Sequence, residues 1–152
     1  MAKSGFTLVE ILVVIALLVL IGGIIIGSLG QINRREALAK ETANLVSLLN
    51  QARALTLASK NSSEYGLHLA VAQVTLFRGL NYDASASTNE VTSLNPLITI
   101  ASYTLTGGGS NIIFDRLTGT TAESGTITLA LVADVAVTKT ITVSVTGVVE
   151  IN

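Results

Sequence analysis

Residues 5–33 read GFTLVEILVVIALLVLIGGIIIGSLGQIN, and this stretch decides the fold of the chain. No charged residue occurs from Ile11 to Asn33. A helix over 17 to 23 of these residues is about 25–35 Å long, close to the roughly 30 Å thickness of a bilayer's hydrocarbon core. The sequence therefore predicts a membrane-spanning helix over residues 6–33.

Glu10 is the one acidic residue at the start of this apolar segment. An unpaired carboxylate at the centre of an inserted helix costs roughly 2.5–3.5 kcal/mol on insertion scales. We expect Glu10 to pair with a new amino terminus, created by cleavage of the chain after Gly5. Two other interpretations stay open. Glu10 extends to the lipid head groups, or the segment is an ordinary secretory signal peptide, although its length and Glu10 argue against the latter.

The composition leaves room for one globular domain of low charge after the apolar segment. The chain has 152 residues, of which 9 are Lys or Arg, 10 are Asp or Glu, and none is Cys. Only 12% are charged, against about 25% in typical proteins, so hydroxyl and amide side chains must cover much of the surface. This balance argues against a general nucleic-acid binder, and the missing cysteines exclude disulfides and thiolate chemistry.

We find no pattern typical of catalysis or metal binding, and we expect no catalytic residues, no metal site, no cofactor and no enzyme activity. His68 is the only histidine, and we expect it at a surface or half-buried strand position. The acidic residues are scattered singly, without the spacing of a calcium loop. Asp115 and Arg116 precede Gly119, which predicts a turn in which Asp115 bonds local backbone amides.

The apolar spacing predicts one helix from about Thr7 to Ser59, apolar all round in its first half and one-faced in its second. The predicted buried stripe consists of Leu38, Leu45, Leu48, Leu49, Ala52 and Leu55. The helix should end in the polar residues Ser59–Ser63. Alternating runs then predict six or seven strands in one or two antiparallel sheets packed on the amphipathic half, with residues 83–95 as a polar loop. The fold class is therefore α+β.

The stretch MAKSG (Met1–Gly5) followed by FTLVE (Phe6–Glu10) resembles the prepilin signal of type IV pilins and type II secretion pseudopilins. The resemblance implies a pilin fold and a leader peptide over residues 1–5, in which Lys3 supplies the cytoplasmic charge. Prepilin peptidase would cut after Gly5 and methylate Phe6. Glu10 would become the fifth mature residue and pair with the Phe6 ammonium of a neighbouring subunit, which sets the register of assembly.

Three C-terminal segments, Asn111–Gly119, Ser124–Leu129 and Ile141–Ile151, resemble the ends of GspH/FimT-type minor pilins. This implies a structural subunit near the tip of a type II secretion pseudopilus or a type IV pilus. Its partners would be other pilin subunits, prepilin peptidase, the inner-membrane assembly platform and, before assembly, the lipid bilayer. Such a protein crosses the bacterial inner membrane once, and residues 34–152 (a helix over 34–60, strands over 64–152) lie in the periplasm or outside.

Two alternatives differ from this interpretation. A major pilin would share the same N-terminal motif. A DNA-binding FimT-like minor pilin would carry arginines around the last glycine-containing strand, whereas Thr146–Ile151 has valines and an acid there. Because phosphate contacts require clustered Lys or Arg, we do not expect nucleic acid as a partner.

Overall fold

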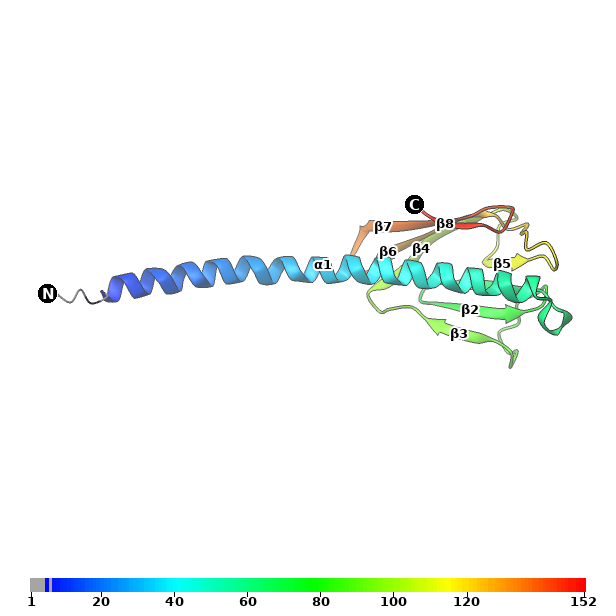
Figure 1. Ribbon diagram of the computed structural model, residues 1–152, viewed down its shortest axis with the longest axis horizontal. Helices are drawn as coiled ribbons and strands as arrows, with labels where there is room; N and C mark the ends of the chain where they lie inside the picture. Colours follow the sequence, from blue (N-terminus) through cyan, green and yellow to red (C-terminus); the bar gives the residue numbers. More distant parts are fainter. Residues whose placement is uncertain (1–4, 6) are drawn as a thin grey trace. The chain divides into compact units, whose positions relative to one another are not determined.

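The structure is a computed structural model of the chain, and it describes Gly5 and residues 7–152, with side chains described outside 22–29. The leader residues 1–4 and Phe6 therefore lie outside the described residues. The chain divides into two compact units, Met1–Arg34 and Arg35–Asn152. The helix α1 (Leu8–Leu57) begins in the first unit and ends in the second (Figure 1).

In the first unit, α1 presents apolar side chains on all its faces. The large apolar residues from Leu8 to Ile21 are each 50–77% exposed. Within the part of the chain that the structure describes, no helix is both long enough and apolar enough to cross a membrane. The membrane span over residues 6–33 stays a prediction.

In the second unit, α1 buries one face and exposes the other, as its spacing predicts. The buried face consists of Leu38, Thr42, Leu45, Leu49, Ala52 and Thr56. Leu48 and Leu55 of the predicted stripe are half-buried. The two threonines were missed because they are polar. Each hydroxyl donates to the carbonyl four residues earlier, at 2.7 Å for Thr42 and 2.9 Å for Thr56, so no polar group is left unpaired on this face.

The helix ends just before the polar break, two residues ahead of the predicted end at Ser59. It stops at Leu57, and a short 3₁₀ helix, η1 (Lys60–Ser62), follows. Ser59 and Asn61 have positive φ values of 47° and 54°. Because a left-handed residue cannot continue an α-helix, these positions turn the chain back toward the first strand.

Eight strands follow the helix in two four-stranded antiparallel sheets. Their bounds are β1 (Tyr65–Ala70), β2 (Gln73–Arg78), β3 (Glu90–Ser93), β4 (Ile98–Leu105), β5 (Asn111–Phe114), β6 (Gly125–Leu131), β7 (Asp134–Val143) and β8 (Val149–Ile151). The strand orders are β3-β2-β1-β5 and β4-β6-β7-β8. The α+β fold with antiparallel sheets on the amphipathic half of the helix is confirmed.

The predicted number of strands, six or seven, is wrong because β3 lies inside the segment expected to be a loop. β3 pairs with β2 from Gln73↔Ser93 to Leu76↔Glu90. Its side chains are exposed or half-buried, so its sequence has no apolar alternation. Backbone bonds to β2 hold it in place, and such bonds leave no mark in the sequence.

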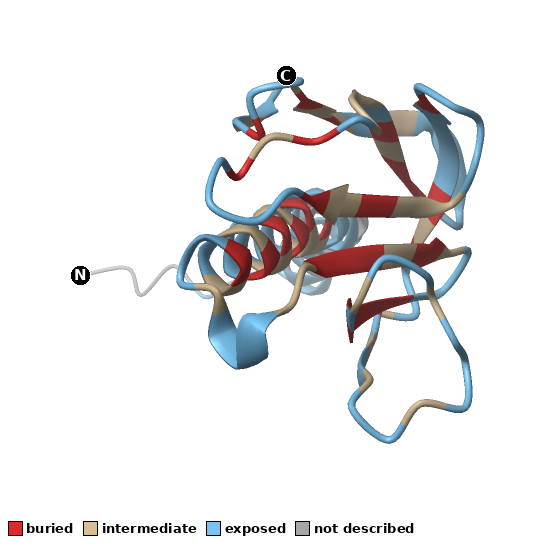
Figure 2. Cartoon of the chain, turned by 90° about the vertical axis from the view of Figure 1, so that its right-hand side faces the viewer, coloured by how far each residue is buried: buried red, intermediate tan, exposed pale blue. Residues whose placement is uncertain are grey.

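The core of the second unit lies between the two sheets and the buried face of α1, and Figure 2 shows buried stretches on all three. Its fully buried members include Leu45 and Leu49 of α1, Leu67, Ile112 and Phe114 of the first sheet, and Ile127, Leu129 and Ile141 of the second. Burial of each such side chain stabilises the fold by about 1.5–3 kcal/mol. One core therefore joins the helix to both sheets.

The other face of the β4-β6-β7 ladder carries rows of hydroxyl side chains. Thr126 pairs with Thr104 and Thr142, and Thr128 pairs with Ser102 and Thr140. These four partners, together with Thr126 and Thr128 themselves, are exposed or half-buried. This face accounts for the predicted hydroxyl-rich surface.

Candidate functional site

The first turn of α1 is closed by a side-chain cap at Thr7. The Glu10 N–H lies 3.3 Å from Thr7 Oγ1 and 3.1 Å from the Thr7 carbonyl oxygen, and both accept from it. A Ser or Thr three residues before a Glu is the signature of a capping box. The sequence analysis missed this signal in Thr7–Glu10, and the observed cap joins the Thr7 side chain to the Glu10 backbone N–H.

The Glu10 side chain is exposed, so its carboxylate is free to meet a group from outside the chain. Its position in the first turn also places it at the positive end of the helix dipole, which stabilises a negative charge there. The helix dipole explains why an acid is tolerated at this position. It does not test the predicted pairing with a neighbouring amino terminus.

Gly5 is exposed, and a Cβ built on it would meet no atom within 4 Å. Phe6, the predicted methylated terminus, lies outside the described residues. Cleavage after Gly5 and methylation of Phe6 stay predictions.

The first two turns of α1 offer an apolar surface suited to packing against lipid or another helix. Leu8, Ile11, Leu12 and Ile15 line one open groove. Their spacing of three and four residues places them on one side of the helix. A side chain from a neighbouring apolar helix would fit between such ridges.

His68 occupies a half-buried strand position, as predicted, and it is a structural residue. Its Nδ1 lies 2.7 Å from Asn111 Oδ1, and its ring stacks on Tyr82 with centroids 3.9 Å apart and an angle of 6°. Tyr82 in turn meets the Phe77 ring edge-on at 5.5 Å. Among the described residues, no group of three or more His, Cys, Asp or Glu could hold a metal ion.

Asp115 lies in a turn, as predicted, but the predicted contacts of its side chain were wrong. The carboxylate accepts from the Thr120 hydroxyl at 2.8 Å, while the Asp115 backbone carbonyl accepts from the Gly119 N–H at 2.9 Å. Leu117 and Gly119 have positive φ values of 70° and 66°, which bend the chain and bring Thr120 alongside Asp115. The hydroxyl therefore takes the place of a backbone amide.

Arg53 is a residue that the sequence analysis missed, and it ties α1 to two C-terminal turns. Its Nε donates to the Gly119 carbonyl at 3.0 Å, and its Nη2 donates to the Thr146 carbonyl at 3.2 Å. These partners lie 66 and 93 residues away in the chain, so no local pattern could indicate them. We call this arrangement the Arg53 bridge.

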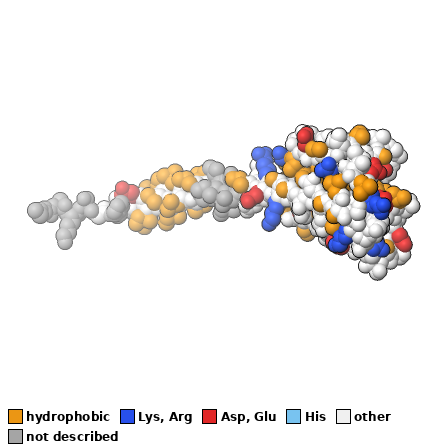
Figure 3. Space-filling view, turned by 45° about the vertical axis from the view of Figure 1, so that its right-hand side comes forward, with side chains coloured by type: hydrophobic (Ala, Val, Ile, Leu, Met, Phe, Trp, Pro, Cys, Tyr) orange, Lys and Arg blue, Asp and Glu red, His pale blue; other side chains and the backbone are white. Residues whose placement is uncertain are grey.

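The Arg53 bridge bears on the DNA-binding alternative, because it brings a guanidinium group to the last glycine turn. That group already donates to two carbonyls, and Arg116 donates through Nη1 to the Ser62 carbonyl at 2.8 Å. On the face drawn in Figure 3, the basic side chains over the sheets are single spots, not a patch. These positions give little support to a phosphate-binding surface.

No protein-family model matches the chain, and no curated protein matches it. Two solved structures that are similar to it are crystal forms of the type IV minor pilin FimU from Pseudomonas aeruginosa strain PAO1. The likeness has TM-scores of 0.57 and 0.58 at 11% identity, and it covers 76% and 78% of this chain and 92% and 90% of FimU. The chain is therefore type IV pilin-like in its fold, which confirms the fold that its N-terminal motif implied.

Proposed function

We propose that this protein is a minor pilin or pseudopilin, a structural subunit without catalytic activity. One coincidence carries the proposal: a FimU-like fold occurs in the same chain as the Gly5–Glu10 motif, which opens a helix with apolar side chains on every face. The fold, the processing motif and the apolar helix come from different observations, and each one fits a subunit that assembles through its N-terminal helix.

The exposed apolar helix requires a non-aqueous environment. From Leu8 to Ile21 its large side chains are half-exposed or more in the single chain. A helix that is apolar all round is stable within a membrane or within a protein core. We assign the bilayer of the inner membrane to it before assembly, and the helices of other pilin subunits afterwards. Residues 34–152 then lie on the periplasmic or outer side.

Processing creates a positively charged partner for Glu10. Cleavage after Gly5 by prepilin peptidase leaves Phe6 with a free, then methylated, ammonium group. Glu10 of one subunit pairs with that ammonium on its neighbour at the assembly platform. A buried charge is tolerated when it is paired and costly when it is not, so the pairing selects one register for each added subunit.

Processing is tested by mass spectrometry of the protein purified from its native cell envelope. The mature chain should begin with N-methylated Phe6. Gly5→Val should leave the leader attached, because the larger side chain crowds the cleaved bond. Gly30→Val is the matched control, since a Cβ at Gly30 also meets no atom within 4 Å. A native protein that retains residues 1–5 would overturn the proposal.

Assembly is tested by the amount of the subunit found in sheared filaments or in the envelope secretion complex. Glu10→Gln should still be processed but should be absent from the assembled fraction. Glu36→Gln, at another exposed position of α1, should assemble normally. The fraction that holds the wild-type protein also separates a pilus from a pseudopilus, and its abundance there separates a minor subunit from a major one.

A further inference from the structure

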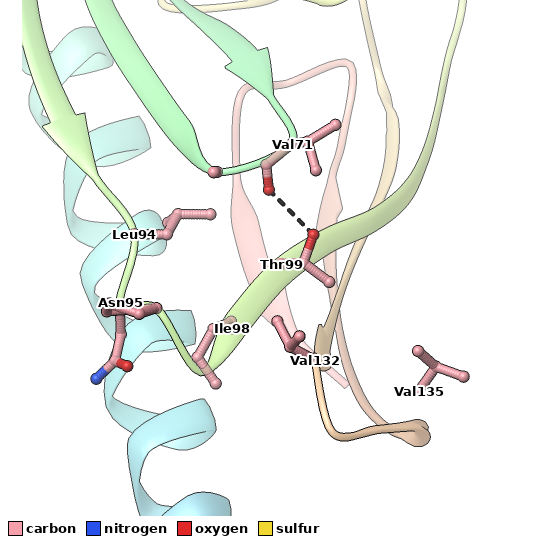
Figure 4. Close-up of a pocket in the computed structure, with 9 residues that line it drawn as sticks. Val71, Leu94, Asn95, Ile98, Thr99, Val132 and Val135 are labelled. Atoms are coloured by element: carbon pink, nitrogen blue, oxygen red, sulfur yellow. Dashed lines mark hydrogen bonds between the residues drawn. The ribbon is translucent and has the colours of Figure 1, made fainter.

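Three loops of the second unit meet at the end where α1 enters it (Figure 1). They are the β1–β2 turn, the segment between β3 and β4, and the β6–β7 turn. Backbone hydrogen bonds join them: the Leu94 N–H donates to the Ala72 carbonyl at 2.9 Å, and the Val132 N–H donates to the Leu97 carbonyl at 2.9 Å. Thr99 Oγ1, at the start of β4, donates to the Val71 carbonyl at 3.1 Å (Figure 4). The three loops therefore hold one another in fixed positions.

The tips of these loops and the start of β7 carry exposed aliphatic side chains. Val71 is 70% exposed, Leu97 46%, Val132 58% and Val135 69%. All except Leu97 line an open hollow of about 440 Å³. The Leu97 carbonyl accepts a hydrogen bond from the N–H of Val132, which does line the hollow. Single exposed apolar residues are ordinary, but a group that surrounds one hollow indicates a surface that is covered by something else. We call these four residues the loop-tip patch.

We propose that the loop-tip patch rests on the lipid surface of the membrane that holds α1, and this inference depends on the membrane anchoring proposed above. The chain enters the second unit at Arg35, directly after the apolar segment assigned to the bilayer. The patch lies at that same end of the unit, so lipid is the first apolar medium within its reach. The transfer of aliphatic loop tips from water into the head-group boundary of a bilayer is favourable in free energy.

The polar groups around the patch set the depth of this contact. Asp134 lies between Val132 and Val135, is exposed, and accepts from the Ala136 N–H at 3.2 Å. A carboxylate is costly in the hydrocarbon core, so it keeps the loop at the level of the head groups. The patch therefore holds the globular unit against the membrane surface without inserting it, until assembly withdraws the subunit.

The test uses the full chain, which contains no cysteine, so single-cysteine variants can each carry one fluorophore. Val135→Cys and Val71→Cys mark the patch. Val145→Cys is the matched control, because Val145 is 62% exposed and its carbonyl accepts from Thr121 N–H outside the three loops. Each labelled protein is reconstituted into phosphatidylcholine vesicles that contain a lipid with a nitroxide quencher in its head group. We expect several-fold stronger quenching at the two patch positions than at Val145.

A second variant guards against effects of the label itself. Val135→Asp adds a charge to the patch and should lower the quenching measured at Val71→Cys toward the Val145 level. Circular dichroism then verifies that the variant keeps its fold. Equal quenching at all three labelled positions would overturn the inference.

Two further outcomes are distinguishable. If quenching at the patch falls as the protein-to-lipid ratio rises, a second copy of the chain covers the patch. That result would also overturn the inference. Vesicle flotation of the same samples reports on anchoring alone. If the protein does not float with the vesicles, the anchoring proposal and this inference fail together; if it floats without patch quenching, only this inference fails.

Discussion

Removal of the Arg53 bridge should destabilise the globular unit by an amount that can be worked out from its contacts. Gly119 is buried, and among the described residues its carbonyl accepts a hydrogen bond from Arg53 alone. A buried carbonyl left without a donor costs about 1–3 kcal/mol, and a hydrogen bond from a charged donor contributes about 1.5–3 kcal/mol. Thr146 is exposed, so water replaces its lost bond at little cost. We expect Arg53→Met to lower the free energy of unfolding by about 2–3 kcal/mol.

The assay is urea unfolding of the full chain in detergent, followed by the β-sheet signal in circular dichroism. With a slope of roughly 1–3 kcal/mol per molar urea, the midpoint should fall by about 0.7–3 M at an unchanged slope. Arg116→Met is the matched control, because Arg116 is exposed and bonds one exposed carbonyl, so its effect should stay within about 0.5 kcal/mol. Equal midpoints for the two variants would refute the reasoning.

Three further expectations concern the strands, one loop carboxyl and DNA. Gly125→Ala should prevent stable folding, because the new Cβ would lie 1.9 Å from the Thr104 carbonyl oxygen, whereas Gly109→Ala meets no atom within 4 Å and should unfold at the wild-type urea concentration. Hydrogen bonds from the Ser85 hydroxyl and N–H lower the pKa of Asp83 below its usual value. This contact therefore stabilises the fold at pH values above the pKa of the unfolded state, and the stabilisation is lost as pH falls through the pKa of the folded state. In an NMR titration, Ser85→Ala should raise the titration midpoint of Asp83. The full chain should not retard DNA in a gel shift at low salt, and retardation that is lost at high salt would favour the DNA-binding alternative.

The helix and most strands could be predicted from the sequence because burial leaves a period in it. The leucines of the second half of α1 recur at three and four residues, and the run from Tyr65 to Ala70 alternates, since each has one face in the core. β3 and the first half of β7, from Asp134 to Lys139, have mostly exposed side chains. Such strands are held by pairing with a neighbour, and a strand without a buried face shows no apolar period.

The candidate site was predictable only where its residues are close in sequence. Gly5, Phe6 and Glu10 form a local motif, and the Thr7 cap could also have been predicted from the same segment. The Arg53 bridge and the loop-tip patch join residues that only the folded chain brings together. The patch in particular consists of ordinary valines and a leucine from three separate loops and the start of β7, and its meaning depends on their common position at one end of the unit.

The cap at Thr7 sharpens the test of Glu10, because the helix start and the charge of Glu10 can be changed separately. The observed bond joins Thr7 Oγ1 to the Glu10 backbone N–H, and glutamine serves in a capping box as well as glutamate does, so the cap needs no charge at position 10. Glu10→Gln should therefore keep the helix start and lose assembly, whereas Thr7→Val should weaken the helix start by about 1 kcal/mol and keep the charge that pairs with the ammonium. Amide exchange at residues 8–11 measures the helix start, and the sheared fraction measures assembly. If Glu10→Gln assembles like the wild type while Thr7→Val does not, assembly depends on the helix start and not on the charge of Glu10, and the pairing that defines the proposed register does not exist.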